Sequence, residues 1–426
     1  MYDTDRRGPA MLLGCMLVIF VVVACGLFAV VSSDSVRNRL AALPRYAETT
    51  YNKLRPKPAL PTPPPISGVD ATTLLQNPAG NTDTPAYTDD ILNSAEAAAD
   101  EAAVVQLVEN SVVSEIAPIA PAVALPGIRH EWQTWNNCGP STVAMNLSFY
   151  SHPGTQVEAA QFLKPNADDK NVNPDELVAY ATLQGYQGFV GVGGTTEQLK
   201  QFLSNGLPVM VEFWTERDDA GGMGHYRLFS GFDAASNQFI AQDSLQGANL
   251  RVPVDAFDAD WRVFNRTYML VFPAEKLPLA FTIAGKSAIE PLKYQQALGV
   301  AQAEAQNNPA DPFAWFNIGT NYARLGDTER AAAAFDEARR LGLPYRMLWY
   351  QFDIFAVYLA QGRTQELIDL AGAVLDATGG LEELYYYRGL AYRAQGDTEA
   401  ARADFEAALE YNPRFEPARL ELGGGN

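Results

Sequence analysis

Cysteine is scarce in this chain of 426 residues, which contains only three. Cys15 and Cys25 lie in an apolar stretch near the N-terminus, so Cys138 is the sole cysteine in the rest of the sequence. No intramolecular disulfide can therefore form outside that stretch. Histidine is equally rare, with three residues, which leaves few candidates for a general base that works near neutral pH.

Positive charge is also in short supply. The formal net charge is −19, and a chain without a basic field does not attract the phosphates of nucleic acid. We therefore predict no nucleic-acid partner. The shortage is uneven, because residues 1–66 contain eight Lys or Arg against four Asp or Glu, whereas residues 67–127 contain nine acids and no base.

Charge is absent altogether from Pro9 to Val31. These 23 residues are apolar enough and long enough to cross a bilayer as one helix, so we predict a membrane anchor at residues 9–31. The motif Val22-Val23-Ala24-Cys25 resembles a bacterial lipoprotein cleavage box, which makes lipidation of Cys25 an alternative tether. Basic residues flank both ends of the run and leave the orientation open. We favour extracytoplasmic soluble domains at the cell membrane, because a Pro-rich spacer follows the anchor.

Residues 32–127 have the composition of a linker. A Pro-rich part with the motif KPALPTPPPISG comes first, and a part rich in Ala, Asp, Glu, Thr and Asn follows. Such compositions favour extended or disordered chain. Only Asp89 to Glu115 has apolar residues spaced for a weak helix, so we predict a largely disordered linker that builds no core.

With 47% hydrophobic residues, the remaining chain can bury more than one core. We place the first folded domain at residues 128–275, with helices first and strands afterwards, an α+β order. After a helix that begins at Cys138, helices are expected at 173–181 and 195–204, the second with a capping box of Thr195 and Gln198. Strands are expected at 207–214, 225–232, 238–244 and 267–272.

The stretch WNNCGPSTVAMNLSFY places Cys138 at the start of a helix. Pro140 suits the first turn, and the side chain of Asn137 can cap the first amides. A thiol in this position feels the positive end of the helix dipole, which favours the nucleophilic thiolate. The alternative is an inert core cysteine. The helix-start position and the polar Asn136 and Asn137 beside it favour the nucleophile.

A nucleophilic Cys138 needs a base from His130, His152 or His225. His152 follows the far end of the cysteine helix and is therefore some ~20 Å from the thiol. His130 lies on the approach loop, where we expect a solvated surface residue. His225 begins a strand after the Gly-rich loop TERDDAGGMG and can point into a cleft, so it is the preferred base.

The third member of the site is predicted to be Asp243, on the strand that pairs with that of His225, where its carboxylate can orient the imidazole. A strand-end turn is the plain alternative for this residue. Asp233 competes, but its place in the hairpin turn explains it without function. Gln133 can offer an amide N–H to an oxyanion beside the N–H of Cys138, or make an ordinary loop hydrogen bond.

These residues carry a resemblance. The order Gln133, Asn137-Cys138-Gly139-Pro140, Gly224-His225-Tyr226, Gly231-Phe232-Asp233 and Gln242-Asp243 resembles the bacteriocin-leader (double-glycine) peptidases and their stand-alone relatives, which have a papain-like fold. The resemblance implies a Cys138 nucleophile, a His225 base, an Asp243 orienter and a Gln133 oxyanion donor. Two departures matter: Gln133 stands five residues before the cysteine, where papain-like enzymes place it six before, and no transporter domain follows, so export-coupled cleavage is not implied.

A repeat occupies residues 288–422. The segments Trp315–Ala338 and Tyr385–Ala408 align at an offset of 70 residues, and Gly319 with Gly389 and Phe335 with Phe405 are among the matched positions. This pattern resembles tetratricopeptide repeats, whose period is 34. A degenerate middle copy and an incomplete leading unit at 291–308 complete an all-α solenoid that can bind a protein partner or substrate.

The sequence therefore predicts a membrane-tethered cysteine peptidase with a Cys-His-Asp triad, acting on a peptide or protein substrate. Its predicted fold is an α+β papain-like domain plus a tetratricopeptide-repeat solenoid, after a transmembrane helix and a disordered linker. The chemistry needs neither cofactor nor metal, and we predict none. A catalytically inactive peptide-binding scaffold and a thiol-dependent acyl or amide transferase are the alternatives.

Overall fold

The structure is a computed structural model that describes residues 60–63, 71–75, 116–166, 169–215 and 222–423. All of them belong to one compact unit, Pro58–Asn426. The predicted anchor at residues 9–31 and the weak helix predicted between Asp89 and Glu115 lie outside the described residues. Within the described ranges, no helix combines the length and the apolar character that a bilayer crossing requires.

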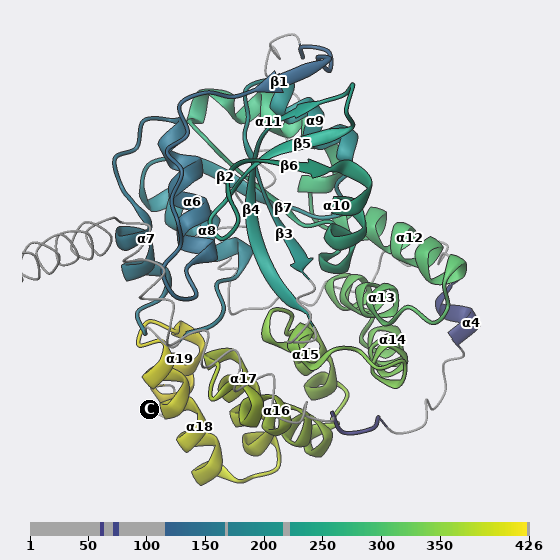
Figure 1. Cartoon of the computed structure of the whole chain (residues 1–426). Helices are drawn as coiled ribbons and strands as arrows, with labels where there is room; N and C mark the ends of the chain where they lie inside the picture. The colour runs from purple at the N-terminus through teal and green to yellow at the C-terminus, as the bar shows by residue number, and fades with distance from the viewer. Residues whose placement is uncertain (1–59, 64–70, 76–115, 167–168, 216–221, 424–426) are drawn as a thin grey trace, which may run out of the picture. The chain divides into compact units, whose positions relative to one another are not determined.

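An antiparallel sheet forms the centre of the first domain (Figure 1). Its strands follow the order β2-β7-β3-β4-β5-β6, and β1 pairs with β4. The strands are β1 (Ala122–Ala124), β2 (Gln187–Gly191), β3 (Val209–Thr215), β4 (Met223–Asp233), β5 (Gln238–Asp243), β6 (Gly247–Pro253) and β7 (Tyr268–Phe272). The four strands expected from the sequence correspond to β3, β4, β5 and β7, whereas β1, β2 and β6 were not expected.

Helices cover both faces of this sheet (Figure 1). They are α6 (Cys138–Phe149), α7 (Gln156–Leu163), α8 (Pro174–Leu183), α9 (Thr196–Ser204), α10 (Val254–Trp261) and α11 (Leu277–Ala284), with 3-10 turns η1 (Arg262–Phe264), η2 (Ala274–Lys276) and η3 (Gly285–Ala288). The two-residue period of β3 separates the cores: Val211 and Phe213 face α9 and α10, whereas Met210 packs with α6 and α8. The domain is therefore α+β, with α6 held on one face of the sheet.

The start of α9 differs in one detail from the prediction. Thr195 caps α9, because its hydroxyl accepts from the N–H of Gln198 at 3.1 Å. Gln198 does not close a capping box. Its side-chain Oε1 accepts instead from the hydroxyl of Ser287 at 3.2 Å, and its amide donates to the carbonyl of Ala284 at 2.8 Å, which ties α9 to the end of α11. A long-range donor has therefore displaced the local one.

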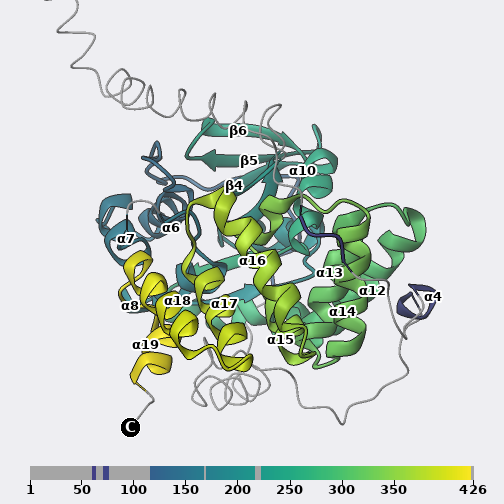
Figure 2. The same ribbon diagram turned by 90° about the horizontal axis from the view of Figure 1, so that it is seen from below.

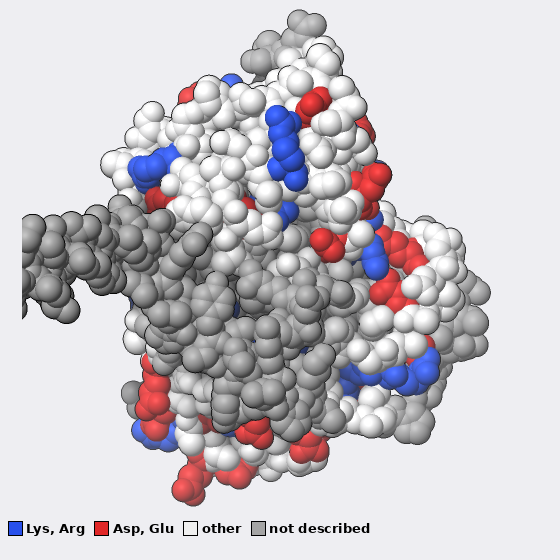
Figure 3. Space-filling model, viewed as in Figure 1, with Lys and Arg blue, Asp and Glu red and all other residues white. Residues whose placement is uncertain are grey.

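The C-terminal region is a row of antiparallel helices, stacked side by side when seen from below (Figure 2). These are α12 (Leu292–Asn307), α13 (Pro312–Arg324), α14 (Thr328–Arg340), η4 (Tyr345–Trp349), α15 (Asp353–Ala360), α16 (Thr364–Thr378), α17 (Glu382–Ala394), α18 (Thr398–Tyr411) and α19 (Glu416–Gly423). On the face drawn in Figure 3, acidic side chains are more widespread than basic ones over the lower repeat helices, in keeping with the net charge of −19.

Both complete repeats turn between their helices by the same local chemistry. Gly326 and Gly396 adopt left-handed φ angles of 83° and 84°, which glycine reaches without a Cβ penalty. The following residues, Asp327 and Asp397, each accept an amide N–H of the next helix at 3.0 Å. The repeated motif Gly-Asp-Thr is thus a turn followed by a helix cap.

The linker prediction fails at two described places. Leu74, in the short helix α4 (Ala71–Leu74), is fully buried in the repeat core, and its carbonyl accepts from Gln302 at 2.8 Å. Strand β1 pairs with β4, so the first domain begins before residue 128. Apolar residues inside a polar stretch were enough to dock these segments on cores formed elsewhere in the chain.

Candidate active site

Cys138 is the first residue of α6 and is partly exposed at its N-terminal end. From Gly139 to Ser148 the helix is buried, as its composition predicts. Asn137 occupies the cap position but makes no side-chain cap bond. Its Oδ1, the atom that a cap would use, accepts instead from Nζ of Lys164 at 3.4 Å, and its amide donates to the hydroxyl of Thr134 at 2.7 Å. The predicted cap is therefore wrong, because the lysine at the end of α7, and not a helix amide, reaches the oxygen.

His225 lies on β4, where it pairs with Phe213 of β3. The thiol of Cys138 lies close enough to its imidazole for each group to shift the pKa of the other. The imidazole Nε2 meets Oδ1 of Asp243 at 3.2 Å, and His225 and Asp243 are both buried. Strand pairing between β4 and β5 brings these last two together. The structure thus brings three of the predicted site residues together in one row.

The carboxylate of Asp243 is held from several sides. Oδ1 also accepts from the backbone N–H of Leu245 and of Gln246, both at 2.8 Å. Oδ2 accepts from Nε of Arg227 at 2.9 Å. Every bond favours the ionised carboxylate, which fixes the orientation of the imidazole of His225.

The row of hydrogen bonds changes the acid–base behaviour of its members. Burial acts to raise the pKa of the Cys138 thiol, but the hydrogen bond and charge of His225 outweigh it and lower that pKa. Burial acts to lower the pKa of His225, yet the bonds to Asp243 and Cys138 raise it to about 9. For Asp243, burial is outweighed by His225 and Arg227, which hold its pKa below the usual range. These directions favour a thiolate beside an imidazolium.

Gln133 is anchored at the end of β5. Its backbone N–H donates to the carbonyl of Ser244 at 2.9 Å, and its side-chain Oε1 accepts from the hydroxyl of Ser244 at 2.8 Å. His130 lies on the same loop, and its Nε2 is 3.0 Å from the carbonyl oxygen of Asp243. The expectation of a solvated His130 is therefore wrong, since the residue is half-buried and ties the loop to the strand.

Residues 126–269 match the model of the Peptidase_C39 like family, and residues 314–340 and 382–415 match tetratricopeptide repeat models. The chain carries a C39-like peptidase domain followed by tetratricopeptide repeats. The resemblance found in the sequence is thereby confirmed.

Curated relatives match a smaller share. Tetratricopeptide repeat protein 16 of Homo sapiens is 30% identical over 141 residues, which are 31% of this chain and 16% of that protein. The FK506-binding protein-like protein of Mus musculus is 34% identical over 112 residues, 25% of this chain and 32% of the relative. The chain spans about a sixth and a third of these two relatives, respectively.

Two solved structures align with about a third of the chain. A C39-like protein from Bacillus anthracis aligns over 36% of this chain and 98% of its own length, with 14% identity and a TM-score of 0.30. A double glycine motif protease from an AMS/PCAT transporter, in complex with the leader peptide, aligns over 36% and 95%, with 16% identity and a TM-score of 0.28. Values this low say nothing about activity.

The competing residues of the C39-like domain lie elsewhere. His152 follows the C-terminal end of α6, opposite the end that carries Cys138. Asp233 ends β4 in the hairpin turn, and its carboxylate accepts from the N–H of Ala235 at 3.0 Å. Both placements agree with the expectation that neither residue serves the thiol. Across the described part of the chain, no group of three His, Cys, Asp or Glu side chains could hold a metal ion.

Three further residues belong to the surroundings of the thiol and were not predicted. Arg227 pairs with Asp243, while Glu212 and Tyr350 line the small pocket next to Cys138. Arg227 and Glu212 each interrupt an apolar strand, a signal that the sequence did contain. Tyr350 follows η4 of the repeats, and nothing local in the sequence indicates its proximity to the thiol.

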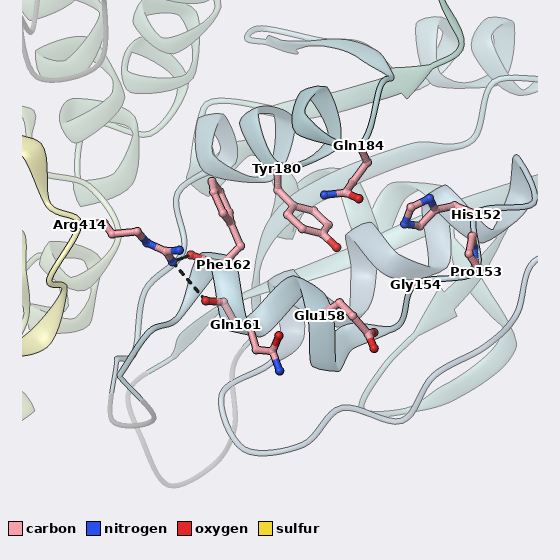
Figure 4. A pocket seen from close by; sticks show the side chains of 9 residues that line it. All are labelled: His152, Pro153, Gly154, Glu158, Gln161, Phe162, Tyr180, Gln184 and Arg414. Carbon is pink, nitrogen blue, oxygen red and sulfur yellow. Dashed lines mark hydrogen bonds between the residues drawn. The ribbon is translucent and has the colours of Figure 1, made fainter.

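A larger groove lies at the other end of α6 (Figure 4). Arg414 reaches it from the repeats and donates to the carbonyls of Gln161 and Phe162 at the end of α7. Its guanidinium also lies 4.8 Å from the ring centroid of Phe162. These contacts join the repeats to the C39-like domain at a place away from the thiol.

Proposed function

We propose that this chain is a cysteine peptidase in which Cys138 is the nucleophile and His225 the general base. The observation that carries the proposal is the continuous row from the thiol through the imidazole to the carboxylate of Asp243. A core cysteine has no use for a buried, carboxylate-oriented histidine. The match to the C39-like family supports the same conclusion.

The proposed reaction has two stages. The thiolate of Cys138 attacks the carbonyl carbon of a peptide bond, and the imidazolium of His225 gives its proton to the leaving amine as the C–N bond breaks. A water molecule then loses a proton to the imidazole and attacks the thioester, which releases the acid and restores the thiolate. Asp243 keeps the imidazole in one orientation throughout.

The oxyanion of each stage needs donors beside the thiol. The N–H of Cys138 stands in the first turn of α6, where amides lack an intrahelical acceptor. Gln133 is proposed as the second donor. Its Oε1 is bound by Ser244, so the NH₂ group is the part of the amide proposed to donate to the oxyanion. Loss of one such donor typically costs ~10²–10³-fold in kcat.

The same proposal includes the predicted surroundings: a papain-like arrangement, a tether through residues 9–31, soluble domains outside the cytoplasm, and repeats that bind a protein partner or substrate. The uncharged run of residues supports the tether, and the repeats support a protein partner. An inactive scaffold is disfavoured because the thiol, imidazole and carboxylate remain together in one row. An acyl or amide transferase would differ only in the nucleophile of the second stage.

The test is the rate of Cys138 alkylation by iodoacetamide as a function of pH. We expect an apparent pKa below the ~8.5 of a free cysteine. His225→Ala should raise that pKa and lower peptide turnover by ~10²–10⁴-fold. His152→Ala is the matched control and should change neither quantity. An ordinary thiol pKa in the wild type, or full turnover in His225→Ala, contradicts the assignment.

A further inference from the structure

Glu212 breaks the pattern of the strand on which it lies. The run Leu207–Trp214 is apolar apart from this one residue, and on β3 it pairs with Tyr226 of β4. Its neighbours on the same face of the strand, Met210 and Trp214, are buried in apolar cores. An aliphatic side chain would pack at this position without an unbonded polar group. Packing therefore does not explain the carboxyl group.

One oxygen of the Glu212 carboxyl group lacks a partner. The side chain is 2% exposed, and its Oε2 is buried without a hydrogen bond. The nearest hydroxyl on the paired strand is not available to it, because Tyr226 donates to the carbonyl of Val172 at 2.7 Å. A buried polar atom left unbonded costs about 1–3 kcal/mol.

The carboxyl group also lines the pocket that contains the thiol. Cys138, Glu212, Tyr226 and Tyr350 all border this pocket, so the carboxyl group lies beside the thiol. An unbonded acid at the reacting centre is therefore placed to meet a donor that the substrate brings.

The charges acting on Glu212 are negative. Burial raises the pKa of its carboxyl well above the usual range, and the negative charges of Cys138 and Asp175 raise it further. Tyr226 and Tyr350 are the other titratable groups in contact with it, and burial keeps both phenols neutral. Lys170 borders the same pocket but is not among the charges that act on this carboxyl. A cation bound next to Glu212 would stabilise the ionised form of its carboxyl group.

We propose that Glu212 is a specificity-determining residue that binds a positively charged group of the substrate beside the scissile bond. The chemistry is an ammonium or guanidinium group, from a Lys or Arg side chain or from a free peptide N-terminus. Such a cation supplies the missing hydrogen bonds and offsets the charges of the thiolate and of Asp175. The inference rests on the proposed function, because it assigns a substrate class to the same pocket.

The test uses peptide acyloxymethyl ketones, which alkylate a nucleophilic cysteine. In the first set, each peptide carries one lysine, and the position of this lysine relative to the reactive ketone differs from peptide to peptide. A matched peptide has norleucine, which has a similar shape but no charge, at the same position. A second set compares a free with an acetylated N-terminus. We expect one lysine position, or the free N-terminus, to speed labelling of Cys138 about tenfold or more over its neutral counterpart. The preference should grow as pH rises, because the ionised carboxylate binds the cation.

Glu212→Gln keeps the shape and removes the charge. This variant should label equally with both members of each pair, while Glu197→Gln, an exposed carboxyl on α9, should keep the preference. Glu212→Gln should also raise the melting temperature at pH 8, since it relieves a buried unpaired acid, whereas a purely structural glutamate would lower it.

Labelling with iodoacetamide distinguishes a failure of the proposed peptidase function from a failure of the role of Glu212. A wild-type Cys138 that iodoacetamide labels like an ordinary thiol overturns the peptidase proposal and this inference with it. A reactive Cys138 without preference for any charged probe overturns the role of Glu212 alone. So does a preference that survives in Glu212→Gln.

Discussion

Asp243 is the residue on which the bonds of the candidate site converge. Its side chain accepts from His225, Arg227 and two backbone amides, and its carbonyl oxygen lies 3.0 Å from the Nε2 of His130. The carboxylate therefore has two functions: it orients the imidazole, and it balances the buried charge of Arg227. A change of this residue should affect stability and reactivity together.

Replacing Asp243 with Asn should lower the free energy of unfolding by about 3 kcal/mol, because it leaves the guanidinium of Arg227 buried without its counter-charge. The pKa of the wild-type carboxyl is depressed by folding, so its contribution is present above the unfolded pKa of about 3.9 and is lost as the pH falls below it. Urea denaturation at pH 7 and at pH 3 measures this difference, which should shrink at the lower pH.

Asp233→Asn is the matched control for this change. Asp233 is the half-buried acid of the hairpin turn, away from the thiol, so alkylation of Cys138 should keep its wild-type rate. Slower alkylation in Asp233→Asn but not in Asp243→Asn would mean that Asp233, and not Asp243, orients the imidazole. That result would contradict the assignment of Asp243.

At the scale of elements, glycine decides how closely the repeat helices approach. A Cβ atom at Gly319 of α13 would lie 2.6 Å from the ring of Phe335 of α14. At the equivalent position of the last repeat, a Cβ at Gly389 would lie 2.6 Å from Phe405. The two repeats therefore use the same contact of glycine with phenylalanine, which explains why both residues recur in the sequence.

Gly319→Ala should destabilise the protein by about 1–3 kcal/mol, because a packed ring must move to admit the methyl group. Gly299→Ala provides the comparison, since a Cβ there meets no atom within 4 Å on an exposed face of α12. It should stabilise the protein by about 0.5–1 kcal/mol through helix propensity alone. Denaturation followed by circular dichroism tests both, and equal effects of the same sign would refute the packing argument.

At the scale of the whole described unit, the repeats and the C39-like domain share a core. Trp214 and Phe264 of the C39-like domain are buried among repeat residues. Glu383 of α17 accepts from the side-chain amides of Asn171 and Asn173 at 3.2 and 3.1 Å, and Asn171 also borders the thiol pocket. The repeats thus contact the wall of the candidate site directly.

Glu383→Gln tests this contact. Burial raises the pKa of Glu383 well above the usual range, and the negative charges of Glu382 and Asp169 raise it further. A raised carboxyl pKa favours the folded state at low pH and opposes it as the pH rises. The variant keeps the acceptor for the two asparagines, so it should match the wild type near pH 4 and exceed it by about 1–3 kcal/mol at pH 8.

The exposed Glu399 of α18 supplies the control. Glu399→Gln should leave the thermal melt unchanged at both pH values. A loss of stability in Glu383→Gln at pH 8 would mean that this interface depends on an ionised carboxylate, against the expectation.

Local signals in the sequence were sufficient for several features. The helix that begins at Cys138, the strands β3, β4, β5 and β7, and the repeat helices follow from periodicity, helix-start residues and turn glycines, all of which act within a few residues. The proximity of His225 and Asp243 also followed, because consecutive strands joined by a short turn pair with each other.

Tertiary structure alone decided the contacts between distant segments. The side-chain oxygens of Asn137 and Gln198 left the expected helix amides for Lys164 and Ser287, because donors from distant segments reached them. Tyr350 of the repeats reached the thiol pocket across more than two hundred residues, and no local pattern encodes such a distance. The burial of Glu212 likewise depends on residues of α6, β4 and the repeats, which border the same pocket. These segments come together only in the folded chain.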